Sequence, residues 1–390
     1  MDETDFAKWV ARARARALSD EDIAKLAESL AASGERLEAL ERSADFASTG
    51  GPGSLSTLWA PAILAASGYT VPKLGVPGRP AGGVDALAQV PGYRVNLNRT
   101  EVNAVLDDCG YVHLLAGNHF APADAAMFAY RQRVGAQGIP ALAIASLLAK
   151  KLSMGVQLVG LEVRVARPGN FGRDIAAARR NAHRFCDVAQ WLGLDPLCIV
   201  TDGKRPQQPY IGRGEAILAL ARLLEDEGCP WLVEHASSCG EWVSALIDAP
   251  AATRSDAARS FSANLISQGG STDGFLAKAS AIVATHTKTV EASRDGILQY
   301  DGGALRDAIL AARMPDEGTS FDDSAGLVLL VRPGSFVKSG EPLVSVRCGD
   351  KRWPALRCAV ASAIKLASGD QDDTPIKFNG ALEIIGVGSR

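Results

Sequence analysis

Three consecutive segments decide the fold: VQLVGLEVRV (residues 156–165), GRDIAAARRNAHRFCDVAQWLGL (172–194) and PLCIVTDG (196–203). The first and third are runs of β-branched and apolar residues that end in turn residues, which is typical of buried strands. The segment between them has the length of a helix. A strand, a helix and a second strand in this order indicate an α/β sheet.

Further helices are predicted on both sides of this unit. Ser19 and Asp22 have the spacing of a helix capping box, and apolar residues recur at helical intervals until Gly34. The segments 121–134 and 138–155 each carry a proline near their start, where a helix tolerates it. Another helix is expected from 215 to 227.

Shorter strands are predicted outside the central unit. Residues 71–79 have the pattern of a strand followed by a loop, and residues 109–117 that of a short buried strand. Near the end, residues 326–349 alternate apolar strands with Pro-Gly and Ser-Gly-Glu-Pro turns, which predicts a compact antiparallel element.

Length, composition and charge limit the functions that the protein can have. A chain of 390 residues exceeds the ~100–200 residues of an ordinary domain, so we expect two lobes. Lysine plus arginine (41) nearly balances aspartate plus glutamate (44), which argues against nucleic-acid or membrane binding as the main role. The seven cysteines form no CxxC pair, and the opening residues lack the apolar core of a signal peptide. We therefore expect a cytoplasmic protein whose partners are small molecules or a second copy.

Two groups of residues could carry chemistry. The stretch DFASTGGPGSLSTLWAP (45–61) places a glycine-rich turn ahead of an apolar segment, and such a turn can present backbone N–H groups to an anion. A simple tight turn explains the same residues equally well. Ser146 and Lys150 lie four residues apart in an expected helix and so share one face, whereas Lys151 is expected to be solvated.

The order of these segments resembles the thymidine and pyrimidine nucleoside phosphorylase family along most of the chain. The segments that carry the resemblance are STGGPGSLSTLWAPAILAASGYTVPK, AGGVDALAQVPGY, APADAAMFAYR, GIPALAIASLLAKKLSMG, GLEVRV, TDG, GRGEAI, FSANLISQGGS and GLVLLVRPGSFVKSGEPL. The resemblance implies a two-lobed phosphorylase/phosphoribosyltransferase-like fold, α/β with a separate small all-α lobe and a C-terminal α+β extension. The small lobe is expected at 1–41 and 118–152, the α/β lobe at 42–117 and 153–320, and the extension at 321–390.

The resemblance also assigns a base-binding group. In this family, phosphate attacks the anomeric carbon of a pyrimidine nucleoside and releases the base. The family's base-binding arginine, serine and lysine fall on Arg131, Ser146 and Lys150. Such donors suit the chemistry, because the leaving base becomes anionic as the glycosidic bond breaks.

The phosphate side departs from the family. There the turn begins Lys-His-Ser-Thr-Gly-Gly, but here Phe46 and Ala47 precede Ser48-Thr49-Gly50-Gly51, so the usual cation and the usual histidine are both missing. Thr57 keeps a hydroxyl where the family has a serine, and a family threonine aligns with Gly83 in a shortened loop. The expected anion site therefore consists of Ser48, Thr49, Gly50, Gly51 and Thr57, with Lys73 or Arg79 as the rescuing cation.

Three interpretations stay open at this stage. The chain is a phosphorylase with an altered phosphate site, an enzyme that uses another acceptor or water, or a nucleoside-binding homologue without turnover. His119 is a further candidate because the family places its loop beside the cleft, and the catalytic group is unknown because its usual position is Ala47. We expect a homodimer, no cofactor other than phosphate as co-substrate, and no metal, since the histidines and cysteines show no metal-binding spacing.

Overall fold

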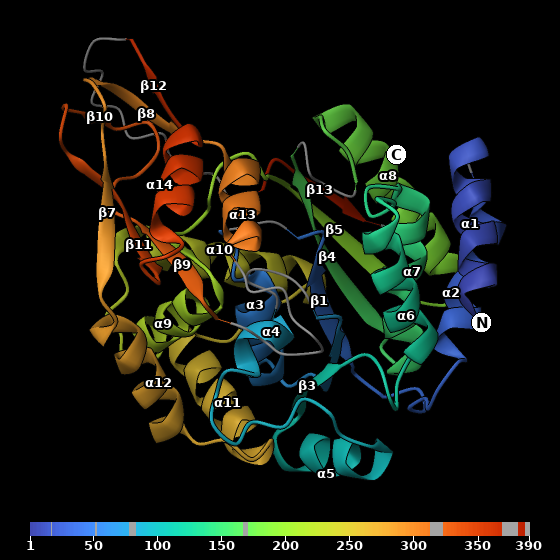
Figure 1. Ribbon diagram of the computed structural model, residues 1–390. Coiled ribbons are helices and arrows are strands. Elements are labelled where there is room, and N and C mark those ends of the chain that lie inside the picture. The colour runs from blue at the N-terminus through green and yellow to red at the C-terminus, as the bar shows by residue number, and fades with distance from the viewer. Residues whose placement is uncertain are drawn as a thin grey trace.

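The computed structural model describes residues 1–16, 18–50, 53–77, 83–166, 171–312, 323–368 and 381–386. Its central sheet has the strand order β1-β4-β5-β13, in which the first three strands are parallel and the last is antiparallel (Figure 1). The bounds are β1 (Ala44–Ser48), β4 (Leu158–Val165), β5 (Asp195–Asp202) and β13 (Glu383–Gly386). The helix α8 (Ile175–Trp191) joins β4 to β5, so the predicted strand, helix and strand are confirmed.

A group of helices lies on one face of this sheet, with α8 packed directly against the strands. Besides α8, it comprises α1 (Glu3–Ala15), α2 (Asp20–Ala31), α6 (Pro122–Arg133) and α7 (Pro140–Ser153), which contact one another (Figure 1). The predicted capping box is present, since the Ser19 side chain accepts from Asp22 N and the Asp22 side chain accepts from Ser19 N. These helices share one hydrophobic core with β4 and α8.

Other helices cover the opposite face. Phe46 of β1 and Ile199 of β5 belong to a second core that they share with this layer. The layer consists of α3 (Ser56–Ala66), α4 (Gly83–Leu87), α5 (Arg99–Cys109), α9 (Arg213–Leu224), α10 (Pro230–Ile247), α11 (Arg254–Ser267) and α12 (Thr272–Ala284). A parallel pair, β2 (Val71–Gly75) and β3 (Tyr111–Leu115), lies beside it and matches both predicted short strands.

The C-terminal part forms two antiparallel sheets with a core of their own. One has the order β6-β9-β11-β7 and the other β10-β8-β12. The bounds are β6 (Tyr210–Ile211), β7 (Thr287–Glu291), β8 (Gly296–Tyr300), β9 (Ala325–Leu329), β10 (Phe336–Val337), β11 (Pro342–Cys348) and β12 (Ile364–Ala367), with α13 (Gly302–Ala311) and α14 (Trp353–Ser362). The antiparallel prediction for 326–349 is confirmed, but three of the partner strands, β6 to β8, come from earlier in the chain.

The described helices include none that is both long and apolar enough to cross a membrane.

Candidate functional site

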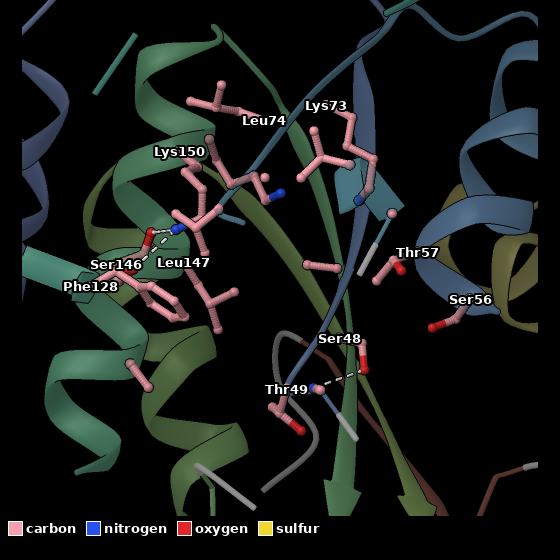
Figure 2. A pocket seen from close by; sticks show the side chains of 18 of the residues that line it. Ser48, Thr49, Ser56, Thr57, Lys73, Leu74, Phe128, Ser146, Leu147 and Lys150 are labelled. Carbon is pink, nitrogen blue, oxygen red and sulfur yellow. Dashed lines mark hydrogen bonds between the residues drawn. The ribbon is translucent and has the colours of Figure 1, made fainter. Parts of the chain in front are cut away.

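A cavity of about 130 Å³ lies where α6 and α7 face β1, β2 and the start of α3. Figure 2 shows Ser146 and Lys150 on one side and Ser48, Thr57 and Lys73 on the other. The cavity lining includes the following predicted site residues: Ser48, Thr49, Gly50, Thr57, Lys73, Arg131, Ser146 and Lys150. The other two anion-site candidates, Gly51 and Arg79, lie outside the described residues. Residues about 100 positions apart in the sequence thus share one cavity.

The backbone amides of the glycine turn are already engaged. Thr49 N donates to the carbonyl oxygen of Glu162 at 2.9 Å, and Gly50 N donates to Ser48 Oγ at 3.2 Å. Gly50 has a φ of 87°, which favours glycine at this position. The expectation that these two N–H groups are presented to an anion is therefore wrong for the observed conformation. Ser48 and Thr49 both line the cavity, and Thr49 Oγ1 accepts a hydrogen bond from Arg164 N at 3.0 Å.

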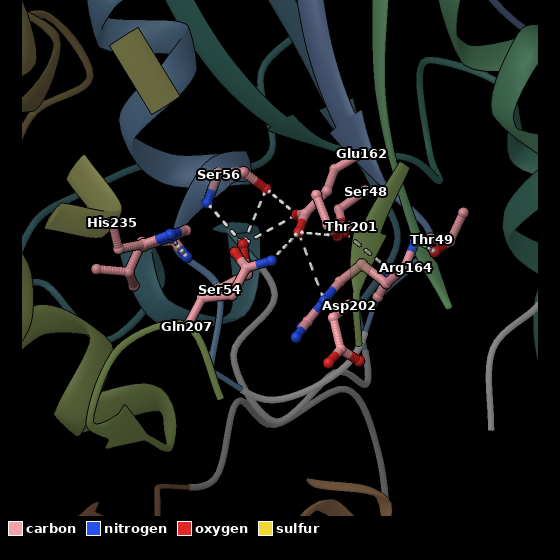
Figure 3. A network of polar contacts seen from close by, with 12 residues as sticks. Ser48, Thr49, Ser54, Ser56, Glu162, Arg164, Thr201, Asp202, Gln207 and His235 are labelled. Atoms are coloured by element: carbon pink, nitrogen blue, oxygen red, sulfur yellow. Dashed lines mark hydrogen bonds and ion pairs between the residues drawn. The ribbon is translucent and has the colours of Figure 1, made fainter. Parts of the chain in front are cut away.

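A buried carboxylate occupies the space behind this turn. Glu162 of β4 is fully buried and accepts hydrogen bonds from Ser54 Oγ (2.9 Å), Ser56 Oγ (2.6 Å), Thr201 Oγ1 (3.0 Å) and Gln207 Nε2 (3.1 Å). Figure 3 shows this network converging on the glutamate. The positive end of a helix dipole stabilises a negative charge. The carboxylate of Glu162 therefore lies at the N-terminus of α3, where it contacts Ser56 and interacts favourably with the helix dipole.

The ionisation of the network follows from its partners. Burial raises the pKa of Glu162, but the guanidinium of Arg164 and the hydroxyl of Ser56 outweigh burial, so the net pKa is lowered. His235 Nε2 accepts from Leu55 N at 2.8 Å, and burial lowers the pKa of this histidine to about 4. An ionised glutamate and a neutral histidine thus fix the chain between the turn and α3.

The side chain at position 46 points away from the cavity. Phe46 is fully buried, and its ring stacks on Trp242 with the centroids 6.2 Å apart. A Cβ on Gly160 would come within 2.8 Å of the same ring. Side chains alternate between the faces of a strand, so Phe46 faces the core while its neighbours Asp45 and Ala47 face the other side. The residue that replaces the family's lysine is a core residue.

Two lysines share one buried carboxylate beside the turn. Lys73 Nζ lies 2.9 Å from Asp45 Oδ1 and also donates to the carbonyl of Phe46, and Lys151 Nζ contacts Asp45 Oδ2. Burial raises the pKa of Asp45, but Lys151 and Lys73 outweigh it and bring the value to about 2. Lys151 is 2% exposed, so the expectation that it is solvated is wrong: it neutralises Asp45.

Lys73 lines the cavity, and its ammonium group contacts the backbone of position 46, where the family has its lysine. Burial lowers its pKa to about 8, although Asp45 opposes this shift. Lys73 belongs to β2 rather than to the shortened loop, and its bond to the Phe46 carbonyl fixes its ammonium group beside the turn.

The predicted helix face is confirmed on α7. Lys150 Nζ donates to Ser146 Oγ at 3.0 Å, to the Ser146 carbonyl and to Asp124 Oδ2 at 2.7 Å. An ammonium group has three donors, so these acceptors use all of them. Asp124 Oδ1 is buried without a partner among the described residues. Lys150 is thus held in place by acceptors at the cavity wall.

Arg131 of α6 lies on the same side of the cavity. Its guanidinium donates to the carbonyls of Leu142 and Gln137, each at 3.1 Å. These contacts tie the end of α6 to the start of α7 and keep the side chain buried at 2% exposure. Arg131, Ser146 and Lys150 therefore line one cavity, and their shared role in binding a base stays a prediction.

His119 lies apart from the other candidates. It is absent from the described cavity lining, and its Nδ1 lies 2.9 Å from Glu35 Oε1. His119 thus forms a contact at the surface between the chain segments around residues 35 and 119.

Sequence reasoning missed another histidine, His113 of β3, which does line the cavity. Burial, followed by the nearby Lys73, lowers its pKa well below the usual value, so the imidazole is neutral. Its Nδ1 lies 3.2 Å from the Tyr111 hydroxyl, and a Cβ at position 83 would come within 2.8 Å of its Nε2. The absence of a side chain at Gly83 is what makes room for this ring, a relation that no spacing in the sequence reveals.

Comparisons of the sequence with known proteins find the relatives that the resemblance predicts. Residues 40–156 match the family described as "Glycosyl transferase family, a/b domain". A thymidine phosphorylase of Sinorhizobium fredii is 29% identical over 85% of this chain and 80% of its own length. A pyrimidine-nucleoside phosphorylase of Geobacillus stearothermophilus is 26% identical over 85% of this chain and 81% of its own. A thymidine phosphorylase of Mycobacterium tuberculosis is 28% identical over 93% of this chain and 86% of its own.

Proposed function

The chain is a divergent relative of the thymidine and pyrimidine-nucleoside phosphorylases along most of its length, and from this premise we propose that it is a pentosyltransferase acting on pyrimidine nucleosides with phosphate. In this reaction an oxygen of phosphate forms a bond to the anomeric carbon of the sugar. The bond from that carbon to the base nitrogen breaks, and its electron pair leaves with the base. The single observation that carries the proposal is the cavity in which Arg131, Ser146 and Lys150 face Ser48, Thr49 and Lys73.

The base side of the cavity supplies positive charge where the reaction develops negative charge. As the glycosidic bond breaks, the charge spreads onto the ring oxygens of the pyrimidine, and preorganised donors stabilise it there. Lys150 and Arg131 are held by neutral carbonyl and hydroxyl acceptors in addition to Asp124. A base oxygen can replace one of these neutral acceptors, and the exchange favours the transition state because an anionic oxygen accepts more strongly than a carbonyl.

The phosphate side relies on side chains. Because the Thr49 and Gly50 amides are engaged within the protein, the hydroxyls of Ser48, Thr49 and Thr57 and the ammonium of Lys73 are the candidate ligands of the anion. Asp45 carries one negative charge, and it pairs with Lys73 through one carboxylate oxygen and with Lys151 through the other. The two lysines and one carboxylate leave a net positive charge beside the turn.

The domain organisation belongs to the same proposal. We propose a small helical lobe at 1–41 and 118–152, an α/β lobe at 42–117 and 153–320, and a C-terminal extension from 321, with phosphorylase-like closure of the helical lobe over the cavity. The packing of α2 on α7 and of α1 on α6 supports the helical lobe. A homodimer in the cytoplasm, with no cofactor besides phosphate, completes the proposal, and light scattering on the purified chain tests the dimer.

Release of free base tests the reaction. The protein is incubated with uridine, thymidine or cytidine, with and without phosphate, and the base is measured by chromatography. We expect base only when phosphate is present, and we expect Lys150→Ala to abolish its release while Lys8→Ala, an exposed lysine of α1, leaves the rate unchanged. Release that is equal without phosphate points to a hydrolase. Nucleoside binding without any release points to a binding protein.

A further inference from the structure

One more cation lines the cavity, and it comes from the C-terminal part of the chain. The described lining contains five cationic side chains: Lys73, Arg131, Lys150, Lys151 and Arg306. The first four are held by carboxylates or carbonyls of the protein, as described above. Within the described residues, Arg306 alone of the five has no such hydrogen bond or ion pair. Its charge is therefore available to a ligand.

The helix that carries Arg306 is firmly seated. The Asp301 side chain caps α13 by accepting from Ala304 N at 3.0 Å. Leu305, which precedes the arginine, and Ile309, about one helical turn after it, are buried in the C-terminal core. Arg306 itself is half-buried, so its backbone is fixed while its side chain reaches from the helix to the cavity.

The start of α13 is connected to the glycine turn through one short segment. Gly302 N donates to the Lys204 carbonyl at 3.3 Å, and Gln207 N donates to the Gly53 carbonyl at 2.8 Å. Gly53 lies so close to Pro206 that a Cβ there would come within 2.8 Å of it. Residues 204–207 thus connect the start of α13 to the chain beside the glycine turn, and Arg306, one helical turn further along α13, lines the same cavity as that turn.

We propose that Arg306 binds a phosphate group of the reacting ligand and supplies, with Lys73, the positive charge that position 46 lacks. This inference rests on the proposed function for the identity of the anion. A guanidinium matches the geometry of two phosphate oxygens, and it keeps its charge at any physiological pH. Position 46 cannot supply this charge here, because Phe46 faces the core and stacks on Trp242, whereas Arg306 lines the cavity.

The phosphate group could belong to either of two sources. Inorganic phosphate would bind as the attacking co-substrate, and the 5′-phosphate of a nucleotide would bind as part of the substrate. The chemistry that Arg306 recognises is the same in both cases. Calorimetric titration with inorganic phosphate, uridine and uridine 5′-monophosphate separates them, because it measures binding whether or not the protein turns over.

The experiment compares the intact chain with Arg306→Ala, Arg306→Lys and a matched control, Arg357→Ala, which removes an exposed arginine from the neighbouring helix α14. We expect Arg306→Ala to weaken phosphate binding by roughly tenfold to a hundredfold, the range of a lost charge-assisted hydrogen bond. Arg306→Lys should restore part of the affinity, and Arg357→Ala should match the intact chain. Thermal unfolding checks that all variants are folded, which is expected since Arg306 holds no partner within the described protein.

Each outcome bears on the inference. A loss confined to inorganic phosphate identifies the co-substrate site, and a loss confined to the nucleotide identifies a substrate-phosphate site. Unchanged binding of both ligands in Arg306→Ala, or no phosphate-dependent binding by the intact chain, overturns the inference. If phosphate binds through Arg306 but no base is released, the proposed phosphorolysis fails while this inference stands.

Discussion

Replacing Phe46 by lysine should destabilise the protein rather than restore the family's phosphate site. Phe46 is fully buried between Trp242 and Gly160, and its side chain points away from the cavity. A lysine here would place its ammonium group in an apolar core. The double variant Phe46→Lys with Ala47→His restores the family's Lys-His pair, so the sequence alone would predict tighter phosphate binding. From the structure we expect this variant to be destabilised for the same reason.

The expected cost follows from the burial. If the ammonium loses its proton to enter the core, deprotonation at about pH 7 costs about 4–5 kcal/mol, because the ordinary lysine pKa of about 10.4 lies more than three units higher. Loss of the ring contacts adds to this, since core Phe→Ala changes cost about 3–5 kcal/mol and lysine refills only part of the space. Folded proteins are stable by only about 5–15 kcal/mol, so the variant should be close to unfolding.

Urea unfolding followed by circular dichroism measures the cost. The matched control is Phe46→Met, whose unbranched side chain has a similar length and no charge, and which should cost less than about 1.5 kcal/mol. We expect Phe46→Lys to be at least about 4 kcal/mol less stable than Phe46→Met, with no gain in phosphate affinity by calorimetry. If the two variants are equally stable and the lysine variant binds phosphate more tightly, the position does reach the anion and our assignment of the cation to Arg306 and Lys73 is wrong.

Three further predictions concern the buried charges. Lys151→Ala leaves Asp45 with a single lysine partner, so we expect a loss of about 3 kcal/mol in the free energy of unfolding; urea unfolding that matches the intact chain would contradict this role. Burial lowers the pKa of Lys73 to about 8, so phosphate affinity should fall as pH rises from about 7 to about 9; Lys73→Met should remove that dependence in calorimetry, and a persisting dependence would exclude Lys73. The pairing lowers the pKa of Asp45 in the folded protein to about 2, below the ordinary value of an aspartate. Its stabilising contribution is therefore present above about pH 4 and is lost as the pH falls through about 2. Asp45→Asn should flatten the acid-unfolding curve there, and an unchanged curve would refute the pairing.

Local patterns predicted the elements well. The run from 156 to 203 gave β4, α8 and β5 within a few residues, because burial of β-branched runs and a helical period leave direct marks on the sequence. The capping box at Ser19 and the pairing of Ser146 with Lys150 were also predicted, since both depend on residues three or four apart. By contrast, β13 joins β5 from almost 200 residues away, and no local signal marks that pairing.

The sequence predicted part of the candidate site and left the rest open. The residue types at 131, 146 and 150 and the Ser-Thr-Gly-Gly turn were available in the sequence, and so was the loss of the usual lysine at position 46. The sequence left open which way each side chain faces, and it therefore misjudged Lys151 and the free amides of the turn.

The amino-acid sequence by itself determined the order of strands and helices, the resemblance to a family and the absence of its usual cation, because these depend on residue identity and short spacing. Only the tertiary structure decided that Phe46 faces the core, that Lys73 and Lys151 share Asp45, and that Arg306 reaches the cavity from α13. The physical reason is that the charge available to a ligand depends on which ionised groups are already paired, and pairing is set by contacts between segments far apart in the chain.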